Sequence, residues 1–129
     1  MMTDQNDGDG LQGLRVLVVE DETLVAMLLE DMLADHGCEV AATASRIPQA
    51  LEIIDREAGA LQAAILDVNL AGQPSFPIAE ALAERGVPFV FATGYGSGGL
   101  PEAWREQPTL QKPFSHDEVG RMLKAVTGR

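Results

Sequence analysis

Short apolar runs alternate along the chain with segments of helical periodicity. Several of the apolar runs have no polar alternation, which is typical of parallel strands covered on both faces. We expect five strands, at Arg15 to Val19, Glu39 to Ala44, Ala63 to Leu66, Phe89 to Ala92 and Thr109 to Gln111. A helical segment follows each strand. This order predicts an α/β fold, a five-stranded parallel sheet of (βα)5 type with helices on both faces.

The helical segments carry their own start and stop signals. The first is expected from Thr23 to His36, where leucines repeat at helical spacing and Gly37 ends the helix. Ser45 is expected to cap the second helix and Ser75 the third. The last helix has a capping box, because Glu118 follows Ser115 by three residues. Residues 94–108 hold four glycines and two prolines, which leaves room for a short fourth helix only, around Glu102 to Glu106.

Length and composition predict one domain with a short tail. A chain of 129 residues is long enough to bury one core and too short for two ordinary ones. Residues 1–10 are acidic and contain glycine, so we expect a flexible N-terminal tail followed by a domain over residues 11–129. Cys38 is the only cysteine, which excludes an internal disulfide and favours a buried apolar role.

Charge and hydropathy restrict the partners. The formal net charge is −11 and no Lys/Arg cluster stands out, so direct nucleic-acid binding is not expected. The N-terminus lacks the pattern of a signal peptide, and no apolar window is long enough to cross a bilayer. These features predict a cytoplasmic protein without a membrane partner.

Polar residues follow four of the five expected strands. They are Glu20 and Asp21, Asp67, Thr93 and Lys112. In a parallel α/β sheet the carboxyl ends of the strands form the ligand-binding edge, so these side chains should meet there. Two carboxylates about 4 Å apart repel by about 4 kcal/mol at an effective dielectric of 20, and a cation would offset that repulsion. Carboxylate oxygens suit Mg²⁺, while a lysine and a threonine hydroxyl suit the oxygens of a phosphoryl group.

Four sequence motifs resemble those of response regulator receiver domains. They are VLVVEDE from Val16, ILDVNL from Ile65, FATGY from Phe91 and QKPF from Gln111, and they occur in the family's order and spacing. The resemblance covers about Leu14 to the end of the chain. It implies the flavodoxin-like doubly wound fold with strand order 2-1-3-4-5, and a Lys112–Pro113 bond that is often cis.

The resemblance also implies a role for each site residue. Asp67 would be the phosphoacceptor and Asp21 the direct Mg²⁺ ligand, with Glu20 assisting through water. The backbone carbonyl of Asn69 would complete the metal site. Thr93 would sense the phosphoryl group, and Lys112 would pair with it.

One motif is similar to that of a particular subclass. Many receivers carry an aromatic switch residue three positions before the lysine, where this chain has Thr109. The segment PFVFATGY, Pro88 to Tyr95, resembles the subclass named for its Phe-Ala-Thr-Gly-Tyr (FATGUY) motif, which occurs among single-domain receivers and general-stress regulators. Tyr95 is therefore a candidate switch residue.

The resulting functional hypothesis is a single-domain response regulator of a two-component phosphorelay. It would accept a phosphoryl group on Asp67 from a sensor histidine kinase or a histidine phosphotransferase. It would then act through a downstream protein partner or as a sink for phosphoryl groups, and catalyse only its own phosphorylation and dephosphorylation. Two alternatives stay open: a receiver-like interaction module that is never phosphorylated, and an aspartyl-phosphate hydrolase of the haloacid dehalogenase type. The hydrolase would normally have an acid two residues after its nucleophile, where this chain has Asn69.

Overall fold

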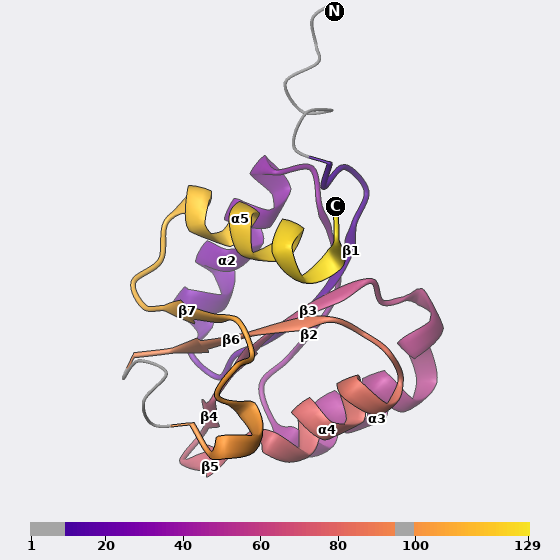
Figure 1. Cartoon of the computed structure of the whole chain (residues 1–129), viewed down its shortest axis with the longest axis vertical. Coiled ribbons are helices and arrows are strands. Elements are labelled where there is room, and N and C mark those ends of the chain that lie inside the picture. The colour runs from indigo at the N-terminus through magenta and orange to yellow at the C-terminus, as the bar shows by residue number, and fades with distance from the viewer. Residues whose placement is uncertain (1–9, 95–99) are drawn as a thin grey trace, which may run out of the picture.

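The computed structural model describes residues 10–94 and 100–129 as a doubly wound α/β domain (Figure 1). Its main sheet contains five parallel strands: β1 (Arg15–Val19), β2 (Glu39–Ala44), β3 (Ala63–Asp67), β6 (Phe89–Thr93) and β7 (Thr109–Gln111). They are ordered β2-β1-β3-β6-β7. Counted along the chain this is the order 2-1-3-4-5, so the predicted fold and strand order are confirmed.

The central strands are buried along their whole length. All five residues of β3 and all five of β6 lie in the interior. This explains why their sequences, AAILD and FVFAT, show no polar alternation: both faces of each strand are covered. The polar residue at the end of each strand, Asp67 and Thr93, is thereby carried to the same edge of the sheet.

Among the described residues, two α-helices cover each face of the sheet (Figure 1). Helices α2 (Thr23–Asp35) and α5 (His116–Thr127) pack on one face, and α3 (Ile47–Glu57) and α4 (Phe76–Glu84) on the other. Each side has its own apolar cluster. Leu29, Leu33 and Leu123 belong to the first cluster, and Ile54 and Leu82 to the second.

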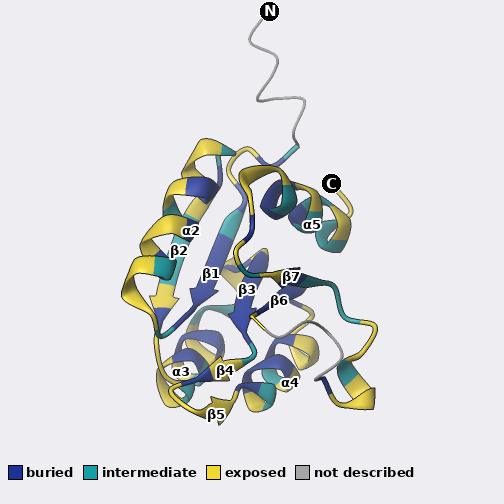
Figure 2. Ribbon diagram, turned by 90° about the vertical axis from the view of Figure 1, so that its left-hand side faces the viewer, coloured by how far each residue is buried: buried dark blue, intermediate teal, exposed yellow. Residues whose placement is uncertain are grey.

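Helix α2 leaves part of its apolar surface in solvent. Its inner face buries Leu29, Met32 and Leu33, but Leu24 is 81% exposed. Met27 and Leu28, one turn further along, are exposed as well. The outer side of α2 is accordingly coloured as exposed over most of its length in Figure 2. The leucine repeat that predicts this helix therefore includes residues outside the core.

The chain between β6 and β7 contains only one short turn of helix among its described residues. This is the 3₁₀ turn η3 (Glu102–Trp104), as the local glycines and prolines predict. The Trp104 ring packs edge-on against Phe89 and Phe91, at centroid distances of 5.9 and 6.0 Å. A second 3₁₀ turn, η1 (Ala58–Ala60), follows α3.

Only one of the three expected serine caps forms as expected. Ser115 and Glu118 make the complete capping box of α5. The prediction for Ser45 is wrong, because α3 begins one residue later and Arg46 holds the N-cap position. Ser75 does occupy the N-cap of α4, but its hydroxyl donates to the carbonyl of Asp67 instead of capping the helix.

The structure bears on three further expectations from the sequence. The Lys112–Pro113 peptide bond is cis. Cys38 is buried in the α2–α5 cluster. Within residues 10–94 and 100–129, no helix has the length and apolar content needed to cross a membrane.

The capping box allows a direct test of the last helix. Replacing Ser115 with alanine removes the acceptor for the Glu118 amide, so the free energy of unfolding should fall by about 1 kcal/mol. Urea denaturation measures this change. Ser45→Ala is the control, because that residue does not occupy the N-cap of α3, and its effect should be much smaller. Equal losses in the two variants would contradict the assignment of the cap.

Candidate functional site

The strand-end residues predicted from the sequence meet at the carboxyl edge of the sheet. Glu20 and Asp21 follow β1, and Asp67 ends β3. One side-chain oxygen of each of these three acids lies within 4.8 Å of one from each of the others. Glu20 is 2% exposed and Asp67 8% exposed, so the repulsion between them is only weakly screened by water.

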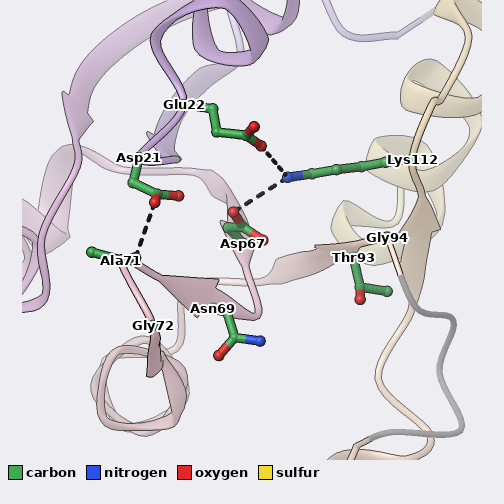
Figure 3. A pocket seen from close by; sticks show the side chains of 9 residues that line it. All are labelled: Asp21, Glu22, Asp67, Asn69, Ala71, Gly72, Thr93, Gly94 and Lys112. Carbon is green, nitrogen blue, oxygen red and sulfur yellow. Dashed lines mark hydrogen bonds and ion pairs between the residues drawn. The ribbon is translucent and has the colours of Figure 1, made fainter.

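Lys112 supplies the positive charge at this edge. Its ammonium nitrogen Nζ lies 2.9 Å from Glu20 Oε1 and 3.3 Å from Asp67 Oδ2. It also lies 3.6 Å from Glu22 Oε1, and Figure 3 shows the side chain reaching toward both Glu22 and Asp67. The backbone of β7 is fixed against β6 here, because the Lys112 amide donates to the Thr93 carbonyl.

One lysine does not neutralise the buried acids. Burial raises the pKa of Asp67 to about 7, and repulsion by Glu20 adds to this, while attraction by Lys112 opposes it. Burial by itself would lower the pKa of Lys112, but its close contact with Glu20 and the attraction of both carboxylates raise it overall. The edge is therefore short of positive charge at neutral pH.

The remaining predicted residues surround a cavity of about 470 Å³. Thr93 is buried and lines it, and Asn69, drawn below Asp67 in Figure 3, lines it as well. The Glu20 carboxylate lies close to those of Asp21 and Asp67, but Glu20 does not line the cavity. Tyr95 lies outside the residues that the structure describes.

A short hairpin that the sequence does not predict closes one side of the cavity. It consists of β4 (Asn69–Leu70) and β5 (Gln73–Pro74), which pair antiparallel. At its tip the Ala71 amide donates a 3.0 Å hydrogen bond to Asp21 Oδ2. The site therefore receives contacts from the chain segment that follows Asp67, as well as from the strand ends.

Comparison with known proteins agrees with the resemblance seen in the sequence motifs. The family model of the response regulator receiver domain matches residues 16–124. This chain belongs to the response regulator receiver domain family. Among curated proteins, it is 31% identical over 127 residues to the transcriptional regulatory protein PdtaR of Mycobacterium tuberculosis, covering 95% of this chain and 61% of PdtaR. It is 32% identical to TcrA of the same species over 126 residues, covering 92% of this chain and 48% of TcrA.

Solved structures show the same receiver fold. The solution structure of SdrG from Sphingomonas melonis Fr1 has a TM-score of 0.77 and 45% identity, with 88% of this chain and 96% of SdrG covered. The receiver domain of PhyR from Erythrobacter litoralis has a TM-score of 0.78 and 29% identity, with 91% and 92% covered. The receiver relatives are signalling proteins. The chain spans only 61% of the length of PdtaR and 48% of that of TcrA, so both curated relatives extend well beyond the matched segment.

The oxygen atoms of this receiver's site fit a hard divalent cation. Glu20 Oε1 is buried and has no hydrogen-bond partner among the described residues, since its 2.9 Å contact with Lys112 is an ion pair without hydrogen-bond geometry. A buried carboxylate has more lone pairs than this one ion pair satisfies, and an ion or ordered water can satisfy the others. Carboxylate oxygens that gather within 4.8 Å form the type of donor set that Mg²⁺ takes.

Sequence reasoning missed three contributors to this site. Glu22 contacts Lys112, and the consecutive acids at positions 20–22 contain that signal. Ser75 was expected to act only as a helix cap, yet its fully buried hydroxyl holds the Asp67 carbonyl at 2.6 Å. The Ala71 contact is made by the backbone, so no side-chain pattern could have indicated it.

The raised pKa of Asp67 predicts a pH-dependent stability in the absence of divalent cations. The native domain should hold a proton on Asp67 between about pH 4 and pH 7, where the unfolded chain has already lost it. Because the native state binds more protons in this window, its stability should fall as the pH rises, by up to about 1.4 kcal/mol per pH unit.

Urea denaturation in chelator from pH 4 to pH 7 measures this contribution as the difference between wild type and Asp67→Asn. The free energy of unfolding of Asp67→Asn should increase relative to that of the wild type as the pH rises. Asp31→Asn, which changes an exposed acid on α2, should follow the wild-type profile. A constant difference between wild type and Asp67→Asn across the window would show that Asp67 titrates normally.

Proposed function

We propose that this chain is a response regulator receiver that accepts a phosphoryl group on Asp67 in a Mg²⁺-dependent reaction. One observation carries the proposal: a buried aspartate at the end of β3 contacts a lysine and lies within 4.8 Å of two further acids. This arrangement combines an oxygen nucleophile with a cation-binding set and a fixed positive charge. Those are the parts that phosphoryl transfer requires, since it depends on positioning and electrostatics.

The metal would be held by oxygen atoms from three parts of the chain. Asp21 and Asp67 would bind Mg²⁺ directly and Glu20 through water, while the backbone carbonyl of Asn69 would complete the protein ligands. When bound, Mg²⁺ supplies charge neutralisation for the carboxylates and for the oxygens of the phosphoryl group. The crowding of Glu20, Asp21 and Asp67 and the burial of the Glu20 carboxylate support this assignment.

Each remaining residue has a defined part in the transfer. An Asp67 carboxylate oxygen would attack the phosphorus of a phosphohistidine, so that a new O–P bond forms as the N–P bond breaks and the imidazole leaves. Lys112, which already contacts Asp67 Oδ2, would then pair with a phosphoryl oxygen. Thr93 would donate its hydroxyl to another oxygen.

The phosphodonor would be a protein, either a sensor histidine kinase or a histidine phosphotransferase. Beside the site lies an apolar groove of about 310 Å³ lined by Val25, Leu28, Pro113 and Phe114, and Lys112 lines both this groove and the site cavity. Exposed Leu24 and Met27 extend the apolar surface along α2. A contiguous exposed apolar surface next to a reacting group suits a protein partner better than a small phosphodonor.

We further propose that residues 11–129 form the receiver domain and that the chain belongs to the FATGUY subclass. The predicted N-terminal tail, residues 1–10, lies outside the described residues except for Gly10. The FATGY motif at Phe91 to Tyr95 supports the subclass, with Tyr95, two positions after Thr93 in the sequence, as a candidate switch residue. Phosphorylation would be read by a downstream protein partner, or the domain would act as a sink for phosphoryl groups. The net charge of −11 argues against direct binding to nucleic acid.

The proposal distinguishes this protein from two alternatives. A receiver-like interaction module would keep its partner surface but take up no phosphoryl group. A haloacid dehalogenase-type hydrolase would release phosphate from added esters in many turnovers, with an acid two residues after the nucleophile. Position 69 of this chain is asparagine, so the chain lacks the acid that such a hydrolase would use.

Intact-mass measurement after incubation with Mg²⁺ and acetyl phosphate tests the proposal. The wild type should gain one phosphoryl group, because Asp67 supplies the nucleophile and the cation offsets the charge that develops on the phosphoryl oxygens. Asp67→Asn should gain none, and chelator should suppress the adduct in the wild type.

Asp55→Asn provides the control, since that acid is exposed and its known contact is an ion pair with Arg85. It should be phosphorylated like the wild type. An adduct that persists in Asp67→Asn, or one that forms equally well in chelator, would contradict the proposed site.

A further inference from the structure

The turn between β4 and β5 requires a backbone conformation that is unfavourable for one of its residues, Ala71. Its two central residues, Ala71 and Gly72, have φ values of 51° and 85°. Positive φ at both positions is the pattern of a type I′ turn, which is usually made by Asn-Gly or Gly-Gly. Gly72 adopts this region freely, but an alanine does so only at a cost. Ala71 is the only residue other than glycine with positive φ in residues 10–94 and 100–129.

The turn places a backbone donor on a metal-ligand candidate. The Ala71 amide donates to Asp21 Oδ2 at 3.0 Å across 50 residues of chain, as Figure 3 shows. A hydrogen bond to one oxygen restricts rotation of the whole carboxylate group. Asp21 is thereby held in one orientation at the mouth of the cavity that Ala71 and Gly72 also line.

The base of the same hairpin is fastened to Asp67. Leu70 is buried in the α3–α4 cluster, and the Ser75 amide donates to the Val68 carbonyl at 2.8 Å. The buried Ser75 hydroxyl donates to the Asp67 carbonyl at 2.6 Å. The segment from Asn69 to Ser75 therefore links the backbone of one site carboxylate to the side chain of another.

We propose that the Asn69–Pro74 hairpin is a positioning element that orients the Asp21 carboxylate for the divalent cation, with the Ala71 amide as its contact group. This inference rests on the Mg²⁺ site of the proposed function. Hydrogen-bond partners of metal ligands fix the ligand orientation, and the strained turn at Ala71 keeps its amide directed at Asp21.

Orientation matters more for Mg²⁺ than for a larger cation. Mg²⁺ requires a near-ideal octahedral arrangement, whereas Ca²⁺ accepts irregular and flexible sets of oxygen ligands. Loosening Asp21 should therefore weaken Mg²⁺ binding more than Ca²⁺ binding. A general loss of stability would not change this ratio of affinities.

The chain offers a matched pair of substitutions for the test. Gly72→Ala places a side chain on a residue with φ of +85°, and the new Cβ would meet nothing within 4 Å. Gly86→Ala does the same at φ of +72°, also in open space, where the chain leaves α4 and enters β6 at the opposite edge of the sheet. Both variants impose the same kind of backbone strain, so they should lose comparable stability in urea denaturation.

Only Gly72→Ala should change the affinity for the divalent cation. Titration of the full chain with Mg²⁺, followed by the amide resonances of the site in heteronuclear NMR, should give a Kd raised by about tenfold. The Ca²⁺ Kd of this variant should change less, and Gly86→Ala should keep both wild-type values. An unchanged Mg²⁺ Kd in Gly72→Ala, or equal changes in the two variants, would overturn the inference.

A second measurement covers the case in which Gly72→Ala does not fold. Hydrogen exchange of the Ala71 amide should be slow in the wild type and accelerated in Asp21→Ala, which has no side-chain acceptor for that amide. Equal exchange in the two proteins would overturn the inference. Failure of the proposed function would look different, because the wild type itself would then bind no Mg²⁺.

Discussion

The repulsion between Glu20, Asp21 and Asp67 is the constraint on which the rest of the site depends. Two of these acids are buried, and oxygens of all three lie within 4.8 Å of one another. Lys112 offsets part of the charge, yet the pKa of Asp67 still rises to about 7. A divalent cation would remove the deficit, and this links metal binding, protonation and the reactivity of Asp67 in one equilibrium.

The fold holds the acids together against this repulsion. They follow neighbouring strands, since β1 pairs directly with β3, and the helices on both faces bury those strands. Stability from the apolar core thus maintains an arrangement of charges that is unfavourable in isolation. The Asn69–Pro74 hairpin and Ser75 add local hydrogen bonds that hold Asp21 and Asp67.

Much of this architecture could be predicted from the sequence, because buried strands and their ends leave clear patterns. The apolar runs located all five strands, and the polar residues after them located Asp67 and Lys112 at one edge. The hairpin could not be predicted, since its strands have two residues each and its Ala71-Gly72 turn lacks the usual asparagine. The role of Ser75 was hidden for another reason: a serine before a helix usually caps it, and only tertiary contact shows that its hydroxyl reaches Asp67.

Proton release on Mg²⁺ binding tests the central claim most directly. Calorimetric titrations at pH 7 in buffers of different ionisation enthalpy count the protons that leave the protein when the cation binds. Because the pKa of Asp67 is about 7, the wild type should release about half a proton per Mg²⁺ bound. Asp67→Asn should release almost none. Binding without proton release in the wild type, or equal release in the two proteins, would contradict the account.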